Sequence, residues 1–340
     1  MNIDNNLPGR PATQSLLLDP ARWPDNSPLS STEIKVAQQH AVLGIGRFIA
    51  QQGLPQAYRP LFPGLIIPLA AWLLQAQRRC GRPLLVGLSG CQGSGKSTLA
   101  LALQLILGNS FASRSCVLSL DDFYLSQEDR KKLAARVHPL LATRGVPGTH
   151  DIGLLERTLD ALARPGRKPV AIPLFDKGRD NPLPTAEWPT VESEPDIIIL
   201  EGWCLGAPAQ PASSLAPPVN DLEQKEDPDM RWRNYVNDQL GQVYEPLFAK
   251  LSPLIYLQPP GWRAVYDWRS RQEHKLISKQ GAAYAGGLDS PDKLERFISH
   301  YQRITEVMLE QIPQKADVTL ALNQNHQFAG LNMPSPANTA

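Results

Sequence analysis

The chain has 340 residues, of which 42% are hydrophobic and 20% charged, and its net charge is +1. This length and composition indicate a globular protein with one large domain and additions, or with two domains. A nearly neutral chain has no charge excess with which to gather nucleic acid or an acidic membrane surface. We therefore expect neither as a partner and look for specific sites instead.

The four cysteines are widely spaced and form neither a C-x-x-C pair nor a cluster with zinc spacing, which favours a reducing cytoplasm. The first thirty residues are polar and contain prolines, so they do not resemble an export signal. The most apolar stretch, residues 61–74, contains Pro63 and Pro68. It is shorter than the ~20 residues that span a bilayer, so we expect a buried helix there.

The predicted elements begin with two helices, at residues 31–53 and 66–79, where apolar residues recur at helical spacing. Residues 1–80 are therefore predicted to be an N-terminal helical extension. From residue 83 onwards, short apolar runs alternate with amphipathic helices, which indicates βαβ units and a parallel sheet. We predict strands at 83–88, 116–120, 169–175, 196–200, 253–257 and 318–322, and helices at 99–107 and 152–162.

The predicted α/β domain covers residues 81–325, and two segments within it break this rhythm. Residues 207–229 are rich in proline, alanine and acidic residues and are predicted to be an exposed insertion. Residues 261–295 combine a basic helix with a small-residue patch at 281–287, which is typical of a lid with a hinge or mobile loop. Residues 326–340 are predicted to be a flexible tail.

A phosphate-binding loop is predicted between the first apolar strand and the helix that follows it. The string G-x-x-x-x-G-K-S occurs there, as Gly90, Cys91, Gln92, Gly93, Ser94, Gly95, Lys96 and Ser97, followed by Thr98. The glycines let the backbone curl so that its N–H groups point inward, and the helix N-terminus adds positive potential. We therefore expect these nine residues to bind ATP, although Cys91 could also be a redox-sensitive thiol or simply a small residue that the loop tolerates.

Two residues of this loop and one carboxylate form the predicted metal site. Lys96 is expected to reach the β- and γ-phosphate oxygens, and Ser97 to ligate Mg²⁺. Glu201 follows the apolar strand at 196–200 and would lie beside the loop at the carboxyl edge of the sheet. It could hold Mg²⁺ through water or orient the acceptor, or it could be a solvated residue at the end of a strand.

Paired carboxylates after the second strand decide between a kinase and other nucleotide-binding proteins. Asp121 and Asp122 follow residues 116–120 and would face the γ-phosphate, where one of them could take the proton of an acceptor hydroxyl. Either could instead cap the helix that begins near Ser126. The segment resembles the D-x-F-Y of uridine kinases and the D-G-F of pantothenate kinases, with Asp121 at the base position.

Several further motifs in order resemble the D-glycerate 3-kinase family of plant and cyanobacterial type and its bacterial and fungal kinase-like relatives. They run over most of the chain, at residues 118–124, 144–151, 173–180, 201–204 and 235–240. The resemblance implies a P-loop NTPase kinase fold with strand order 2-3-1-4-5 and a lid after the fourth strand. It also implies ATP and Mg²⁺ as cofactors and D-glycerate as the acceptor.

Glycerate carries two hydroxyls and a carboxylate, so its site needs a base and a cationic or N–H-rich anchor. The candidates lie in loops predicted at the carboxyl ends of strands: Arg144, His150, Asp151, Asp176, Lys177 and Arg179. Each has another interpretation. Asp151 could cap the helix from Ile152, His150 could bond a loop carbonyl, and the charges at 177 and 179 could be solvated.

The basic helix of residues 262–275 carries Arg269 and Arg271. It could close over ATP and neutralise charge on the γ-phosphoryl group, or it could be a solvated helix. Two other functions stay open. The acceptor could be a nucleoside, pantothenate or a sugar, or the chain could be a regulatory ATPase whose acceptor is water. A small-molecule hydroxy acid remains the expected partner, and the chain a monomer or homodimer.

Overall fold

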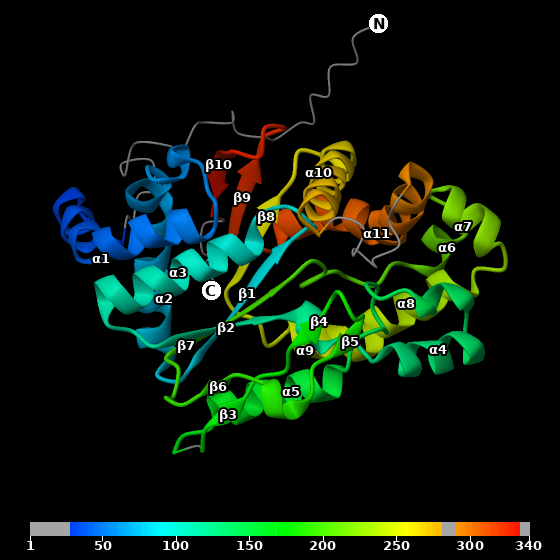
Figure 1. Cartoon of the computed structure of the whole chain (residues 1–340), viewed down its shortest axis with the longest axis horizontal. Helices are drawn as coiled ribbons and strands as arrows, with labels where there is room; N and C mark the ends of the chain where they lie inside the picture. The colour runs from blue at the N-terminus through cyan, green and yellow to red at the C-terminus, as the bar shows by residue number, and fades with distance from the viewer. Residues whose placement is uncertain (1–27, 167, 281–289, 334–340) are drawn as a thin grey trace, which may run out of the picture.

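The computed structural model describes residues 28–166, 168–280 and 290–333, without the side chains of 272–280. A six-stranded sheet forms the centre of the molecule, with the order β10-β9-β8-β1-β7-β2 (Figure 1). Its strands are β1 (Leu84–Gly90), β2 (Ser115–Ser119), β7 (Ile197–Gly202), β8 (Leu254–Gln258), β9 (Val318–Leu322) and β10 (Phe328–Asn332).

Five of these strands are parallel, and β10 pairs antiparallel with β9. Counted along the chain, the parallel strands stand in the order 2-3-1-4-5, which confirms the predicted P-loop kinase topology. Every residue of β7 is buried. Ile197 and Ile199 belong to one hydrophobic core, and Ile198 and Leu200 to a second core on the other face. The continuous apolar run was therefore a reliable sign of a strand covered on both faces.

The predicted strand at residues 169–175 is wrong. Only β3 (Val170–Ala171) and β4 (Phe175–Asp176) form there, and they pair outside the central sheet with β6 (Thr190–Val191) and β5 (Asn181–Pro182). Proline cannot donate a ladder hydrogen bond, and Pro169 and Pro173 interrupt the run. The segment instead forms two small strand pairs, of which β4–β5 contacts η4 (Leu120–Phe123) at the carboxyl end of β2.

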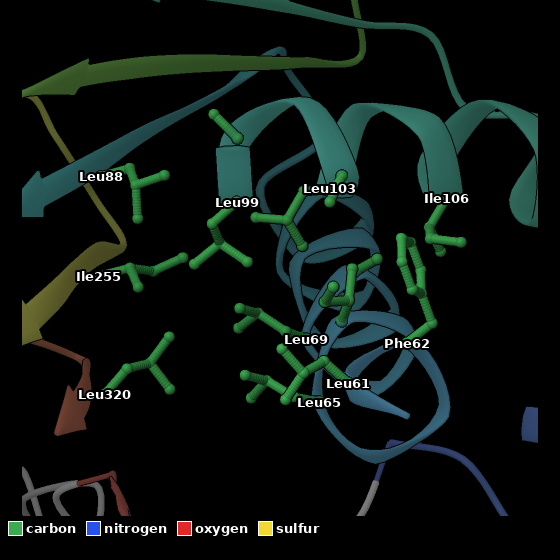
Figure 2. Close-up of a cluster of buried hydrophobic side chains, with 14 of the residues drawn as sticks. Leu61, Phe62, Leu65, Leu69, Leu88, Leu99, Leu103, Ile106, Ile255 and Leu320 are labelled. Atoms are coloured by element: carbon green, nitrogen blue, oxygen red, sulfur yellow. The ribbon is translucent and has the colours of Figure 1, made fainter. Parts of the chain in front are cut away.

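The N-terminal helices share their core with the helix of the P-loop. Helix α1 (Ser31–Gln51) begins with a capping box between Ser30 and Glu33. Both α1 and α2 (Ile67–Cys80) pack against α3 (Lys96–Phe111). Figure 2 shows the side chains at this junction: Leu61, Phe62, Leu65 and Leu69 of the N-terminal segment, Leu99, Leu103 and Ile106 of α3, and Leu88, Ile255 and Leu320 of the strands.

One helical stretch among the described residues, Gln56–Cys80, is long and apolar enough to cross a bilayer by length and composition alone. It is composed of η2 (Gln56–Tyr58), η3 (Phe62–Ile66) and α2, and Leu65, Ile66, Ile67 and Leu69 are at most 1% exposed. The stretch is thus a core helix of the folded protein, as predicted for residues 61–74.

The second core lies on the other face of the sheet (Figure 1). The helices that contribute to it include α5 and α11, and Asp151 and Ser290 cap their N-termini. The remaining helical elements are η4 (Leu120–Phe123), α4 (Gln127–Arg136), η5 (Pro139–Ala142), α5 (Ile152–Ala163), η6 (Thr185–Glu187), α6 (Ala212–Leu215), α7 (Asp221–Glu226), α8 (Arg231–Gln239), η7 (Leu240–Tyr244), α9 (Glu245–Phe248), α10 (Trp262–Gln280), α11 (Pro291–Gln311) and η9 (Ile312–Gln314).

Two predictions about irregular segments need correction. Residues 207–229 are not a simple exposed insertion, because they form α6 and α7 and bury Leu222, Glu223 and Asp227. Residues 326–340 are not a tail throughout, because β10 extends the sheet and Phe328 is 7% exposed. In both cases a distant segment supplies the partner: α8 and α11 for the charged residues, and β9 for β10. Residues 334–340 lie outside the described part of the chain.

Candidate active site

The P-loop follows β1 directly and ends in α3. Gly93 and Gly95 have φ angles of 78° and 89°, in the left-handed region that glycine adopts without strain. Gly95 is also the N-cap of α3, so unpaired N–H groups of the first helical turn face the loop. Cys91 is 4% exposed, and burial raises the pKa of its thiol to about 12. A redox-sensitive thiol at this position is therefore disfavoured.

Lys96 and Ser97, in the first turn of α3, both contact the buried carboxylate of Glu201. Ser97 Oγ donates to Glu201 Oε1 at 2.8 Å, and Lys96 Nζ lies 3.6 Å from Glu201 Oε2. Burial lowers the pKa of Lys96, but the carboxylates of Glu201 and Asp121 outweigh it, so the pKa is raised overall. The predicted alternative of a solvated Glu201 is excluded, since the residue is 4% exposed.

Asp121 lies in η4, just after β2, and both of its carboxylate oxygens have partners. Oδ1 accepts a hydrogen bond from Tyr124 Oη at 3.0 Å, and Oδ2 accepts one from Lys177 Nζ at 2.7 Å. Burial raises the pKa of this carboxyl, but Lys177 and Lys96 lower it more strongly, so it stays well below its usual range. Asp121 does not cap α4, because Ser126 accepts from Asp129 N there.

Asp122 faces a different environment from its neighbour. Its Oδ1 accepts the backbone N–H of Phe175 at 3.2 Å, which ties η4 to the β4–β5 hairpin. Burial raises the pKa of Asp122 to about 6, because the hydrogen bond from Phe175 and the charge of Lys177 compensate only in part. The pKa values of the two adjacent carboxyls are thus shifted in opposite directions. Both carboxyls are therefore mostly ionised at neutral pH, Asp121 more completely than Asp122.

The imidazole ring of His150 stacks on the ring of Tyr124, with 4.4 Å between the ring centroids. Its Nδ1 is 2.7 Å from Tyr244 Oη, which also accepts the backbone N–H of Gly148. His150 is 5% exposed, and burial lowers its pKa to about 3, although the charge of Asp121 acts in the opposite direction. His150 is therefore neutral at physiological pH and does not bond a loop carbonyl through Nδ1. Its Nε2 is buried without a hydrogen-bond partner.

The β4–β5 hairpin carries Lys177 towards Asp121, and arginines hold its base. Arg144 Nη1 and Arg130 Nη2 each contact the carboxylate of Asp180, and both guanidinium groups lie over the ring of Phe175. Arg130 is fully buried, whereas the side chain of Lys177 is 58% exposed. The base of the hairpin is thus fixed, and its cationic tip is open to solvent.

Three of the predicted acceptor residues have structural contacts of their own. Asp151 Oδ1 accepts the N–H of Leu154 at 2.7 Å and caps α5. Asp176 Oδ1 accepts the N–H groups of Gly178 and Arg179. These hydrogen bonds hold the pKa of Asp176 below its usual value, and the one from Arg179 has the larger effect. Arg179 Nε lies 3.4 Å from Asp176 Oδ2, so both side chains close the turn of the hairpin.

Helix α10 packs over the P-loop. A Cβ at Gly93 would lie 3.2 Å from Trp268 Cβ, so glycine permits this close approach. Arg269 lies over the ring of Phe297 and is close enough to lower the pKa of Lys96. Arg271 is exposed. The predicted small-residue patch at 281–287 lies outside the described residues.

Sequence reasoning missed four residues of this site. Arg130 and Asp180 are 50 positions apart, and Tyr244 lies 94 positions from His150. No local sequence pattern predicts either contact. Tyr124 was visible in the segment that follows β2 but was given no role. Its hydroxyl and ring hold both Asp121 and His150 in place.

The comparisons with known proteins agree with this arrangement. No family model matches the chain. It is 34% identical over 235 residues to "Uncharacterized kinase mug58" of Schizosaccharomyces pombe, which covers 65% of this chain and 79% of that protein. It is 29% identical over 245 residues to "D-glycerate 3-kinase, chloroplastic" of Arabidopsis thaliana, across 69% of this chain and 50% of that one. The chain belongs to the P-loop kinases related to D-glycerate 3-kinase.

A solved structure supports the fold of this kinase. The D-glycerate 3-kinase from Cryptococcus neoformans superposes with a TM-score of 0.66 at 24% identity, over 79% of this chain and 99% of that one. The two chains therefore share the same overall fold. The kinases that match in sequence support an ATP-dependent phosphotransferase, as predicted from the P-loop.

The residues around Glu201 fit a magnesium ion. Mg²⁺ takes hard oxygen ligands and is typically held by one or two carboxylates or hydroxyls together with substrate phosphates. Glu201 Oε2 is buried without a hydrogen-bond partner, and the hydroxyl of Ser97 lies against the other oxygen. The ammonium of Lys96 lies 3.6 Å from this oxygen, beyond hydrogen-bond distance, so the oxygen can still coordinate a cation. Ser97 and Glu201 could thus hold the metal directly or through water.

Proposed function

We propose that this kinase transfers the γ-phosphoryl group of ATP to a hydroxyl of D-glycerate, in the cytoplasm and with Mg²⁺. The observation that carries the proposal is the pair of Asp121 and Lys177, 2.7 Å apart at the carboxyl edge of the sheet. A carboxylate base beside a solvent-open ammonium matches a small acceptor that carries both an alcohol and a carboxylate. The likeness to D-glycerate 3-kinases supports the same acceptor.

In the proposed reaction the P-loop N–H groups and Lys96 hold the β- and γ-phosphate oxygens. Ser97 and Glu201 would hold Mg²⁺, which would supply positive charge to the phosphates. Asp121 accepts the proton of the acceptor hydroxyl, whose oxygen forms a bond to the γ-phosphorus while the bond from phosphorus to the bridging oxygen of ADP breaks. Arg269 and Arg271 of α10 add positive charge from the side of the helix.

The acceptor is expected to lie between η4 and the β4–β5 hairpin. Lys177 would bind its carboxylate, and the buried Nε2 of His150 is a further polar group without a hydrogen-bond partner. Arg144 contributes less than predicted to this proposal, because Asp180 already occupies its guanidinium. Asp151, Asp176 and Arg179 are proposed to shape the loop rather than to touch the acceptor.

The test is to incubate the purified protein with ATP and Mg²⁺ and a panel of acceptors: D- and L-glycerate, other hydroxy acids, pantothenate, sugars and nucleosides. Mass spectrometry and NMR would identify the product. We expect a phosphoglycerate from D-glycerate. A preference for pantothenate, a sugar or a nucleoside would overturn the acceptor and keep the kinase. Rapid ATP hydrolysis without any alcohol would instead favour a regulatory ATPase.

A further inference from the structure

The candidate base of this kinase is occupied before any acceptor arrives. Lys177 Nζ holds Oδ2 of Asp121 at 2.7 Å, and Tyr124 Oη holds Oδ1 at 3.0 Å. A carboxylate whose two oxygens accept hydrogen bonds, one of them from a cation, is a weak proton acceptor. Something must therefore free one oxygen before Asp121 can take the proton of an alcohol.

Lys177 is the partner that can leave. Its side chain is 58% exposed and extends from a hairpin whose base is fixed by Arg130 and Arg144. Lysine is a compact charge on a flexible four-carbon stem, so its ammonium can exchange one carboxylate for another while the hairpin stays in place. The other charged or titratable groups near Asp121 are Lys96, His150, Tyr124, Asp122 and Cys204, and each is buried or largely buried in the protein.

We propose that Lys177 determines acceptor specificity by masking Asp121 until the carboxylate of an acidic acceptor draws its ammonium away. The inference rests on the proposed function. The exchange conserves charge, because one carboxylate replaces another beside the ammonium. It leaves Oδ2 of Asp121 free to accept the hydroxyl proton, as the transfer requires. An uncharged alcohol cannot make the exchange, so it meets a masked base.

Kinetic measurements distinguish this masking role from simple binding of the acceptor carboxylate by Lys177. A lysine that only binds the acceptor carboxylate would affect the KM for D-glycerate and leave slow neutral alcohols unchanged. A masking lysine also suppresses the kcat for neutral alcohols, because Asp121 is paired whenever no anionic acceptor is bound. Removing the ammonium should therefore damage the reaction with D-glycerate and improve the reaction with glycerol, which carries hydroxyls but no carboxylate.

The experiment measures kcat and KM of the full chain for D-glycerate and for glycerol in the wild type, Lys177→Met and Lys177→Arg. Lys225→Met is the matched control, because Lys225 also pairs with an aspartate at 2.7 Å but lies on α7. For Lys177→Met we expect at least about a tenfold loss of kcat/KM on D-glycerate and about a tenfold gain of kcat on glycerol. Lys177→Arg should keep the preference for D-glycerate, and Lys225→Met should match the wild type.

A glycerol kcat that stays unchanged or falls in Lys177→Met, with a raised KM for D-glycerate, would overturn the masking role and leave Lys177 as a binding residue. A wild type that does not phosphorylate D-glycerate at all would overturn the proposed function itself. The two failures are thus distinguishable in one set of measurements.

Discussion

Two groups of charged residues in this kinase are built on different principles. The P-loop cluster consists of Lys96, Asp121, Lys177 and Glu201, and it contains a buried carboxylate oxygen without a hydrogen-bond partner and an ammonium open to solvent. The helical network consists of Glu223, Asp227, Arg233 and Arg303, and it joins α7, α8 and α11, which lie at the right of the view in Figure 1.

Every carboxylate oxygen of the helical network has a donor. Glu223 accepts from Arg303, Arg233 and the N–H of Val219, and Asp227 accepts from the N–H groups of Trp232 and Arg233. Buried carboxylates whose oxygens all have donors hold helices together and have no free oxygen for a ligand. The P-loop cluster keeps such an oxygen. The difference teaches that a buried carboxylate oxygen without a hydrogen-bond donor, rather than burial or charge alone, marks the site.

The largest effect is expected from Lys96→Ala, which removes the ammonium nearest the phosphates. We expect kcat to fall by about 10³-fold or more, equivalent to roughly 4 kcal/mol of barrier, because a charge on the transferred group loses its stabilisation. Steady-state assays with D-glycerate would measure this. Circular dichroism would show whether the fold is kept, and a kcat within tenfold of the wild type would contradict the role of Lys96.

Asp121→Asn should come next, since asparagine keeps the shape of the side chain and cannot take a proton. We expect a loss in kcat of about 10²- to 10⁴-fold while the affinity for ATP stays nearly unchanged. Equilibrium binding of ATP and single-turnover kinetics would separate the two quantities. Asp221→Asn, at an exposed position of α7, is the control. A near-normal kcat in Asp121→Asn would show that another group is the base.

Glu223→Gln should give the opposite pattern, with a large effect on stability and little on catalysis. Two buried arginines would lose their shared carboxylate, which typically costs about 3 to 5 kcal/mol of unfolding free energy. Glu226→Gln on the same helix is a matched control, because its pair with Arg296 is half-exposed and should contribute at most about 1 kcal/mol. Urea denaturation would measure both. If Lys96→Ala were unstable and Glu223→Gln stable, the proposed difference between the two groups would be wrong.

The smallest expected effect is a pH dependence from His300, which borders the helical network. Burial lowers the pKa of His300 to about 4 and outweighs the hydrogen bond to the carbonyl of Arg296, so the folded protein keeps this ring neutral. Below about pH 6.5 the unfolded chain binds a proton that the folded chain does not. The contribution of His300 to stability is therefore present at neutral pH and is lost as the pH falls towards 4.

The variant His300→Gln isolates this contribution. We expect the unfolding free energy of the wild type to fall, relative to the variant, by about 2 kcal/mol between pH 7 and pH 5. Denaturation curves at the two pH values would measure the change, with His40→Gln, an exposed position on α1, as the control. A difference between wild type and variant that does not depend on pH would contradict the assignment of a neutral buried ring.

The sequence predicted the parts of this kinase that depend on local pattern. The P-loop, the buried run before Glu201 and the carboxylate pair after β2 could be found because each is a short string at the end of a strand. Residues 169–175 were misread as a strand because an apolar run with prolines does not reveal whether a neighbouring strand is available. Residues 328–332 were misread as tail for the same reason, since β9 is their partner.

Pairings between distant segments could not be predicted for the site either. Nothing near Arg130 in the sequence indicates that Asp180 will contact it, and Asp151 had two equally plausible uses until the position of Leu154 settled one of them. Charges in such loops can be assigned to a partner only when the fold brings the segments together. The residue types that indicate phosphoryl transfer could therefore be recognised in the sequence, whereas the contacts between them could not.

The junction between the N-terminal helices and α3 has a consequence for how this kinase can vary. The floor beneath the nucleotide loop is made by Leu65, Leu69 and their neighbours, far upstream of the motif itself. A substitution there would reposition Lys96 without altering a single residue that meets ATP. The buried side chains of residues 61–69 are thus constrained by the same core that positions the helix of the P-loop.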